Sequence, residues 1–171
     1  MIDAATLTQI WNQHASRLLL VARSIVGDGR TPLAEDAVQE AYVKLAVQDR
    51  LPDDPMAWLV RVVRNQILQS IRSGRRRDVR ESASTNALWF EPDLHEKLDA
   101  DEVTTAMMKL SSPSREIIVM HLWGEMSFDS IGEVFEISRA TAHRRYAAGM
   151  QVLKQQFSVD RDPQSMSTLN E

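Results

Sequence analysis

Arginine side chains gather in one stretch of the chain, in a pattern that could hold a polyanion. The arginines of this stretch are Arg61, Arg64, Arg72, Arg75, Arg76, Arg77 and Arg80. Asp78 is the only acid between Pro55 and Arg80, although the whole chain carries a formal net charge of −4. A segregated positive patch on an acidic protein is the electrostatic footprint of a nucleic acid partner. The alternative for any charge run is a solvated helix face.

The same stretch carries groups suited to separated DNA strands. Strand opening needs cations that hold a displaced backbone and polar groups that hydrogen-bond an extruded base. The residues that could supply them are Arg61, Arg64, Asn65, Arg72, Arg75, Arg76 and Arg77. The apolar residues Trp58, Leu59, Val62, Ile67 and Ile71 of the same segment form one predicted helical stripe, so we expect Trp58 in the core. Such a surface would depend on charge and hydrogen bonds more than on base stacking.

A second cationic segment opens the stretch 139–157, which contains no acid. It follows a short helix predicted at 128–135 and a turn at 136–138, where Ser138 is a good helix N-cap. Helix, tight turn and basic second helix together are typical of a DNA-reading helix-turn-helix, with a plain helical hairpin as the alternative. We expect base contacts from His143 and Arg144, and phosphate contacts from Arg139, Thr141 and Arg145.

Three helices are predicted to position the first cationic cluster. An amphipathic helix spans 5–26, with Trp11 in its apolar stripe, and it ends at Gly27-Asp28-Gly29. A second helix starts at Thr31 and Pro32, and a third starts at Pro55 after Asp54 as N-cap. The buried face of the second helix is Leu33, Ala37, Val38, Ala41, Tyr42 and Leu45. Its outward polar residues are Asp36, Gln39, Glu40 and Lys44.

These patterns predict an all-α fold of two small helical domains joined by an acidic linker. The first domain covers 1–80, and the linker covers 81–98 with an apolar trio at Leu88, Trp89 and Phe90. The second domain covers 99–157, with helices near 103–110 and 115–123 before the helix-turn-helix. Residues 158–171 are polar and are predicted to form a disordered tail.

Composition excludes several classes of function. The chain has no cysteine, which removes disulfides, thiolate nucleophiles and most structural zinc sites. No apolar run approaches the ~18 residues of a membrane helix, and the N-terminus lacks a basic, apolar signal, so we expect a cytoplasmic protein. The four histidines show no ligand spacing, and no phosphate loop or nucleophile motif occurs. We therefore expect no catalytic residue, metal or cofactor.

Three segments together resemble a known family. AEDAVQEAYVKL, WLVRVVRNQILQSIRSGRRR and LSSPSREIIVMHLWGEMSFDSIGEVFEISRATAHRRY follow one another in that order. They resemble the polymerase-binding helix, the −10 helix and the −35 domain of the extracytoplasmic-function (ECF) sigma factors of bacterial RNA polymerase. The resemblance implies that Asp36, Gln39 and Glu40 meet core RNA polymerase. It also implies contacts with promoter DNA, both duplex and single-stranded, and such factors are commonly held off by an anti-sigma protein.

The chain departs from the family pattern at three positions. Gln69 stands where an acid is common, Glu136 stands where the helix-turn-helix usually has glycine, and Ala148 stands where an arginine is frequent. A non-glycine residue in that turn predicts an altered or strained backbone. With alanine at position 148, DNA contacts should concentrate on the first turn and a half of the recognition helix. The promoter sequence is therefore not transferable from relatives.

Other functions remain as alternatives to a sigma factor. A freestanding helix-turn-helix regulator would bind duplex DNA without polymerase, but it needs a dimerisation surface or a ligand pocket, and the sequence shows no sustained heptad or repeated domain. An enzyme acting on nucleic acid would need clustered carboxylates near the basic surface, whereas the acids lie in the linker and on one helix face. The N-terminal half could also serve only as a protein-binding module.

Overall fold

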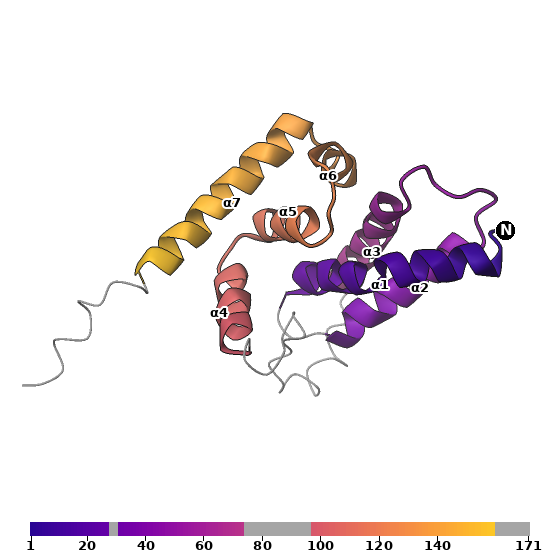
Figure 1. The fold of residues 1–171 in the computed structure, drawn as a ribbon, viewed down its shortest axis with the longest axis horizontal. Helices are drawn as coiled ribbons and strands as arrows, with labels where there is room; N and C mark the ends of the chain where they lie inside the picture. The colour runs from indigo at the N-terminus through magenta and orange to yellow at the C-terminus, as the bar shows by residue number, and fades with distance from the viewer. Residues whose placement is uncertain (28–30, 74–96, 160–171) are drawn as a thin grey trace, which may run out of the picture.

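The chain folds into α-helices throughout the part that the computed structural model describes, which comprises residues 1–27, 31–73 and 97–159. The helices are α1 (Ala4–Val26), α2 (Thr31–Ala46), α3 (Pro55–Arg72), α4 (Lys97–Met108), α5 (Ser112–Leu122), α6 (Phe128–Phe135) and α7 (Arg139–Val159). No strand occurs among these residues. The predicted all-α fold class is confirmed. Figure 1 shows α1, α2 and α3 as one group of helices, with α5 and α6 between that group and the long helix α7.

Side-chain caps start the two helices that carry the predicted DNA-binding residues, α3 (Pro55–Arg72) and α7 (Arg139–Val159). The carboxylate of Asp54 accepts a hydrogen bond from the backbone N–H of Ala57 at 2.9 Å, and Pro55 occupies the first turn of α3. The hydroxyl of Ser138 accepts one from the N–H of Thr141 at 3.1 Å. Both predicted caps are therefore confirmed, and each satisfies a backbone donor that the helix itself leaves free.

The first core lies between α1, α2 and α3. Leu18, Leu45, Leu59 and Ile67 are fully buried there. Trp11, one of the apolar residues of α1, is 45% exposed, and its ring meets Tyr42 edge-on at 4.7 Å between centroids. Tyr42 is buried beside that ring, and burial raises the pKa of Tyr42 to about 12.

On α3 the apolar stripe is broader than predicted. Val60 and Val63 are fully buried beside Leu59 and Ile67, although the predicted stripe did not include them. Trp58 is partly buried and packs against the core, as do Val62 and Ile71. The aromatic ring on α3 is therefore engaged in packing, and the exposed side of this helix is left to its polar and cationic residues.

The second core lies between α5, α6 and α7. Its fully buried side chains include Ile117, Ile118 and Ile131. On α7, Ala142, Gly149 and Leu153 are buried, and Tyr146 is partly buried and packs against the core. A Cβ atom at Gly149 would lie 2.8 Å from Cδ1 of Ile118, closer than van der Waals contact allows. Glycine at this position therefore lets α7 lie tightly against α5.

The turn of the helix-turn-helix is held in a strained conformation. Glu136 ends α6 with φ 55° and ψ 41°, in the left-handed region that favours glycine. Close packing fixes this geometry, because a Cβ atom at Gly132 would lie only 2.7 Å from the carbonyl oxygen of Ile137. The strain predicted from the missing glycine is present in the structure, so α6 and α7 keep their helix-turn-helix arrangement despite the substitution.

Replacing Glu136 with glycine should stabilise this turn. Relief of left-handed strain gains about 1–2 kcal/mol, and the extra backbone entropy of glycine in the unfolded chain offsets about 0.5–1 kcal/mol of that. Glu136→Gly should therefore raise the free energy of unfolding in urea denaturation. Glu102→Gly is the matched control, because Glu102 is exposed inside α4 and glycine there should destabilise. Equal effects of both variants would contradict a strained turn.

Helix boundaries differ from the sequence prediction at three places. Helix α4 begins at Lys97, within the segment assigned to the linker, and α5 begins at Ser112 rather than near Arg115. Helix α7 continues to Val159, two residues into the predicted tail. The predicted trio at Leu88, Trp89 and Phe90 lies outside the described residues, as does most of the acidic linker.

Candidate nucleic-acid and polymerase interfaces

The polar face of α2 is fully available at the surface. Asp36, Gln39 and Glu40 are all exposed, while Ala37, Val38 and Ala41 between them are buried in the first core. This alternation follows from the helical period, which turns residues three and four apart to the same side. The three predicted polymerase-binding residues therefore form one continuous exposed strip.

An apolar residue extends this strip, and the sequence prediction did not include it. The side chain of Val43 is 65% exposed, and positions 36, 39, 40 and 43 share one side of α2. The available signal was its spacing, since Val43 stands three residues after Glu40 and outside the buried stripe. An exposed aliphatic side chain within a polar strip is suited to a protein partner.

Lys44 joins this side of α2 to α3. Its ammonium donates to Oε1 of Gln66 on α3 at 2.8 Å and lies 3.4 Å from Oε1 of Glu40. These exposed contacts link the strip to the helix that carries the first arginine cluster.

The predicted DNA-binding residues of α3 differ in their exposure. Arg61, Asn65 and Arg72 are exposed. Arg64 is not open to solvent as the sequence suggested: its side chain is only 20% exposed, and its Nε donates to Oε2 of Glu116 on α5 at 2.9 Å. Arg75, Arg76 and Arg77 lie outside the described residues. The structure therefore brings Arg61, Arg64 and Asn65 together on one helix.

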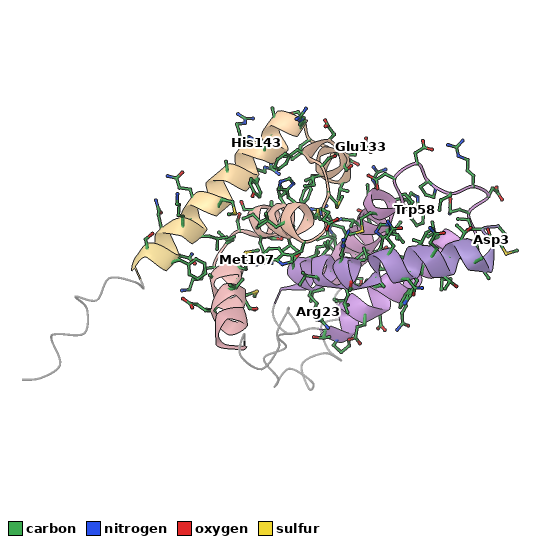
Figure 2. All side chains as sticks on the ribbon, viewed as in Figure 1. Asp3, Arg23, Trp58, Met107, Glu133 and His143 are labelled. Carbon is green, nitrogen blue, oxygen red and sulfur yellow. The ribbon has the colours of Figure 1, made fainter. Side chains whose placement is uncertain are left out.

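The C-terminal helices lie directly against this part of α3. The guanidinium of Arg64 stacks over the ring of Phe135 on α6, 4.3 Å from its centroid. Arg61 faces Glu133 at 3.6 Å, and the carboxylate of Asp54 accepts a hydrogen bond from the Ser130 hydroxyl at 2.9 Å. Figure 2 labels Glu133 on α6, the helix that packs against α3.

Further contacts join α1 to the C-terminal helices. Arg115 of α5 is buried, and its Nε donates to the carbonyl oxygen of Ser24 at 2.8 Å. Gly27 ends α1 beside this arginine with φ 84°, which favours glycine. About two turns earlier on α1, Arg17 forms a 2.7 Å ion pair with Glu125. The two groups of helices are thus packed together by polar as well as apolar contacts.

The first turns of α7 present the second cationic surface. Arg144 is exposed, and its Nη2 donates to the hydroxyl of Thr141 at 3.1 Å. Thr141, predicted to contact phosphate, is therefore also placed to orient Arg144. His143 and Arg145 are exposed on either side, and Figure 2 shows His143 at the end of α7 that adjoins α6.

Neighbouring side chains hold parts of this surface in place. The ring of His143 meets Phe128 edge-on, with 5.1 Å between centroids. Arg139 lies 3.8 Å from the carboxylate of Asp129, and both side chains are largely exposed. All five predicted residues of α7 are thus brought together within its first two turns, with Arg144 opposite the buried position Ala142.

The described residues were searched for a histidine with a shifted pKa, for a metal-binding group and for a membrane-spanning helix. His14 is partly buried, and burial lowers its pKa below the ordinary value, with Arg17 acting in the same direction and Asp54 opposing them. No group of three histidine or acidic side chains there could hold a metal ion. Within the same residues, no helix is both long and apolar enough to cross a membrane.

Comparisons with known proteins agree with this arrangement. The family model for sigma-70 region 2 matches residues 10–77, and the model for sigma-70 region 4 matches residues 100–153. The ECF RNA polymerase sigma factor SigL of Mycobacterium tuberculosis is 26% identical over 159 residues, which cover 89% of each chain.

Solved structures show a similar fold. The sigma factor RpoE of Bartonella quintana, in complex with the anti-sigma factor NepR, has a TM-score of 0.70 at 20% identity, with 90% of this chain and 98% of that chain covered. CnrH, in complex with the cytosolic domain of CnrY, has a TM-score of 0.65 at 25% identity, with 92% and 91% covered. With both sigma-70 regions matched in order, this chain belongs to the sigma-70 family of bacterial RNA polymerase sigma factors, as one of the ECF type.

Proposed function

We propose that this chain binds core RNA polymerase through α2 and directs it to promoters through separate DNA surfaces on α3 and α7. A sigma factor of this family supports promoter-specific initiation by the polymerase and is not itself a catalyst. The assignment of these three functions rests on one observation, which is that the three surfaces lie on different helices. An acidic and polar strip on α2 and a cationic face on α7 are both exposed, while a further cationic group lies on α3.

The strip on α2 is the proposed polymerase-binding surface. Asp36, Gln39 and Glu40 offer acceptors and a carboxamide at the surface, and Val43 adds an apolar contact beside them. Charged groups at such an interface steer association and fix register, whereas the buried apolar contact adds affinity.

The proposed −10 surface is the outer side of α3. Arg61, Arg64 and Arg72 would hold the backbone of a separated strand, and Asn65 would hydrogen-bond an unpaired base. Arg75, Arg76 and Arg77 would extend the cationic surface beyond the helix. Residues 1–80 form the proposed domain for polymerase binding and melting, joined by the linker at 81–98 to the −35 domain at 99–157.

The proposed −35 surface is the start of α7. Arg144 and His143 would reach base edges in the major groove, while Arg139, Thr141 and Arg145 would contact phosphates. We place the protein in the cytoplasm, where it meets polymerase and promoter DNA. Because RpoE was solved with NepR and CnrH with CnrY, an anti-sigma protein is a further proposed partner.

Run-off transcription tests the proposal directly. Purified core polymerase should gain promoter-specific transcripts from a genomic promoter library only when this chain is added, because the chain supplies the promoter-reading surfaces. Protein alone should bind promoter duplex weakly, and this binding should fall with a slope of about −0.9 in log affinity against log salt per neutralised phosphate. Specific nanomolar duplex binding by the chain alone, without stimulation of polymerase, would favour the freestanding regulator.

A further inference from the structure

We propose that His121 and Phe128, two residues outside the predicted DNA-binding set, position the imidazole of His143 and thereby help to set the base preference of the −35 surface. Each acts through the next ring of an aromatic stack that ends at His143. The inference rests on the proposed function of α7, and it adds two specificity-determining residues to that surface.

Four rings from three helices form one cluster at the start of α7. Phe128, the first residue of α6, meets the ring of His143 edge-on, with 5.1 Å between centroids and 87° between the ring planes. Phe128 also stacks on His121 of α5, at 4.2 Å and 22°. Tyr146 of α7 meets His121 edge-on at 4.9 Å and Phe128 at 5.3 Å. Phe128 therefore contacts each of the other three rings.

A hydrogen bond to the backbone anchors the inner end of this stack. Nδ1 of His121 lies 2.9 Å from the carbonyl oxygen of Met126. Because a carbonyl oxygen only accepts, Nδ1 carries the hydrogen and donates it, which fixes both the tautomer and the plane of the ring. Met126 is buried, and its own N–H donates to the carbonyl oxygen of Met120 at 3.0 Å. The acceptor of His121 is thus itself held in the connection between α5 and α6.

The stack runs from the protein towards the recognition surface. His121, Phe128 and Tyr146 are partly buried, whereas His143 is exposed, at the end of α7 that adjoins α6 (Figure 2). An edge-on aromatic contact stabilises more than its buried area alone, so it restricts the rotamers of an exposed histidine. A side chain that is ordered before binding loses less conformational entropy at the interface. The held imidazole also points its ring nitrogens in fewer directions, and base-edge recognition depends on those directions.

Arg144, the other residue assigned to base edges, has a different support. Its Nη2 donates to the hydroxyl of Thr141 at 3.1 Å, a contact in which no ring of the stack takes part. Loss of the stack should therefore impair reading by His143 and leave reading by Arg144 unchanged. A purely structural role of Phe128 would impair both residues, because both lie on the first two turns of α7.

Phe128→Leu is the first test, since it removes the ring and keeps an apolar side chain at the start of α6. Holoenzyme formed with core polymerase should transcribe a barcoded promoter library randomised across the upstream element. We expect Phe128→Leu to reduce preference about two- to tenfold at the position that His143→Ala also flattens. Phe157→Leu is the matched control: Phe157 is partly buried about 21 Å further along α7, so every preference should be unchanged.

Double variants distinguish positioning from structural damage. The measured quantity is the ratio of transcripts from the preferred upstream sequence to the library mean. If Phe128 acts through His143, adding Phe128→Leu to His143→Ala should leave this ratio within about 1.5-fold of that of His143→Ala alone. Adding Phe128→Leu to Arg144→Ala should instead multiply the two single effects, because their supports are separate. A further loss in the His143→Ala background would overturn the positioning role.

His121→Leu provides a second route, in case Phe128→Leu disturbs the start of α6. It removes the ring that holds Phe128 and leaves both residues that we assign to base edges in place. His121→Leu should reduce the same preference and add nothing to His143→Ala. Circular dichroism melting checks that each variant is folded. Unchanged preference in folded Phe128→Leu or folded His121→Leu would overturn the inference.

Histidine NMR reports the position of His143 in the full chain without DNA. The chain has four histidines, so few ring signals occur, and His143→Ala identifies its own. The ring current of Phe128 should displace the His143 signals from those of an unstructured peptide. Phe128→Leu should move them back, and Phe157→Leu should not. Unchanged His143 signals in folded Phe128→Leu would overturn the positioning role.

The proposed function fails on a different result. Absence of promoter-specific transcripts with the unmodified chain would refute the sigma-factor assignment, while the NMR signals would still show whether Phe128 holds His143. With a functional chain, unaltered upstream preference in His143→Ala would overturn the present inference alone, because His143 would then read no base.

Discussion

Reversing the charge of Asp36 (Asp36→Arg) is expected to abolish binding to core RNA polymerase while leaving the helical fold intact. Asp36 is exposed at the N-terminal end of the strip on α2, and its neighbours Ala37 and Val38 carry the packing. Placing two like charges against each other across an interface costs several kcal/mol. A loss of at least about 2 kcal/mol weakens affinity by a factor of about thirty.

The fold should tolerate this change for a physical reason that the structure supplies. Asp36 lies beyond the first turn of α2, which begins at Thr31, so the helix macrodipole gains little from its charge. An exposed substitution away from packing changes stability by about 0.5 kcal/mol or less. Loss of polymerase binding with an unchanged melting curve would thus locate the defect in the interface.

Asp49→Arg is the matched control for the polymerase experiment. It changes the net charge by the same amount, and Asp49 is fully exposed in the loop after α2. Pull-down with core polymerase should retain this variant and lose Asp36→Arg. Val43→Ser should give an intermediate loss, since it removes an apolar contact and leaves all charges in place. Undiminished binding by folded Asp36→Arg would remove α2 from the interface.

Local rules explain why much of the fold was predictable. The bounds of α6 agree with the predicted 128–135, and the cap at Ser138 follows from hydrogen-bonding rules that act over three residues. The exposed strip on α2 follows from the helical period alone. Even the strain at Glu136 was anticipated, because the left-handed region has a simple steric basis.

Long-range contacts explain what the sequence did not predict. Arg64 and Glu116 are separated by 52 positions, and no periodic pattern links them. The sequence predicts that a cation on a basic helix is available to DNA. In the folded chain, a carboxylate from a distant segment pairs with this cation. The exposure of Trp11 has a similar origin, since an apolar residue on a helical stripe is buried only if a neighbouring helix covers it.

Arg61 should contribute to strand separation rather than to reading of the separated strand. Its side chain is exposed. Among the ion pairs described between α3 and α6, it pairs only with Glu133, at 3.6 Å. We therefore expect any defect of Arg61→Ala in open-complex formation to be largely relieved when the template carries a premelted bubble. Arg61→Ala is therefore a useful reference for variants of Arg144 and Asn65, the two residues that should read bases.

Arg144→Ala and Asn65→Ala should produce opposite patterns on duplex and bubble templates. Arg144 stands on the outer side of α7, oriented by Thr141 at 3.1 Å, so its loss should relax preference at one upstream position. The cost should be about 1–3 kcal/mol if the contact is bidentate. Because the upstream element remains duplex, this defect should persist on a template whose downstream element is already open.

Asn65→Ala should instead impair recognition of the downstream element. Asn65 is exposed on α3 between Arg61 and Arg72, where its carboxamide can hydrogen-bond an unpaired base. Binding of single-stranded oligonucleotides that carry this element should weaken, and a premelted bubble should not restore it. Asn12→Ala, an exposed amide on α1, should have no such effect.

Permanganate footprinting of open complexes separates the two surfaces. Arg145→Ala is the control for Arg144→Ala, because loss of a phosphate contact should weaken all sequences alike and reduce the salt slope by about one. Loss of a base contact should instead change the order of preference among promoters. Rescue of Arg144→Ala by the bubble, or an effect of Asn65→Ala confined to upstream duplex contacts, would contradict the assignment of α7 to duplex and α3 to single-stranded DNA.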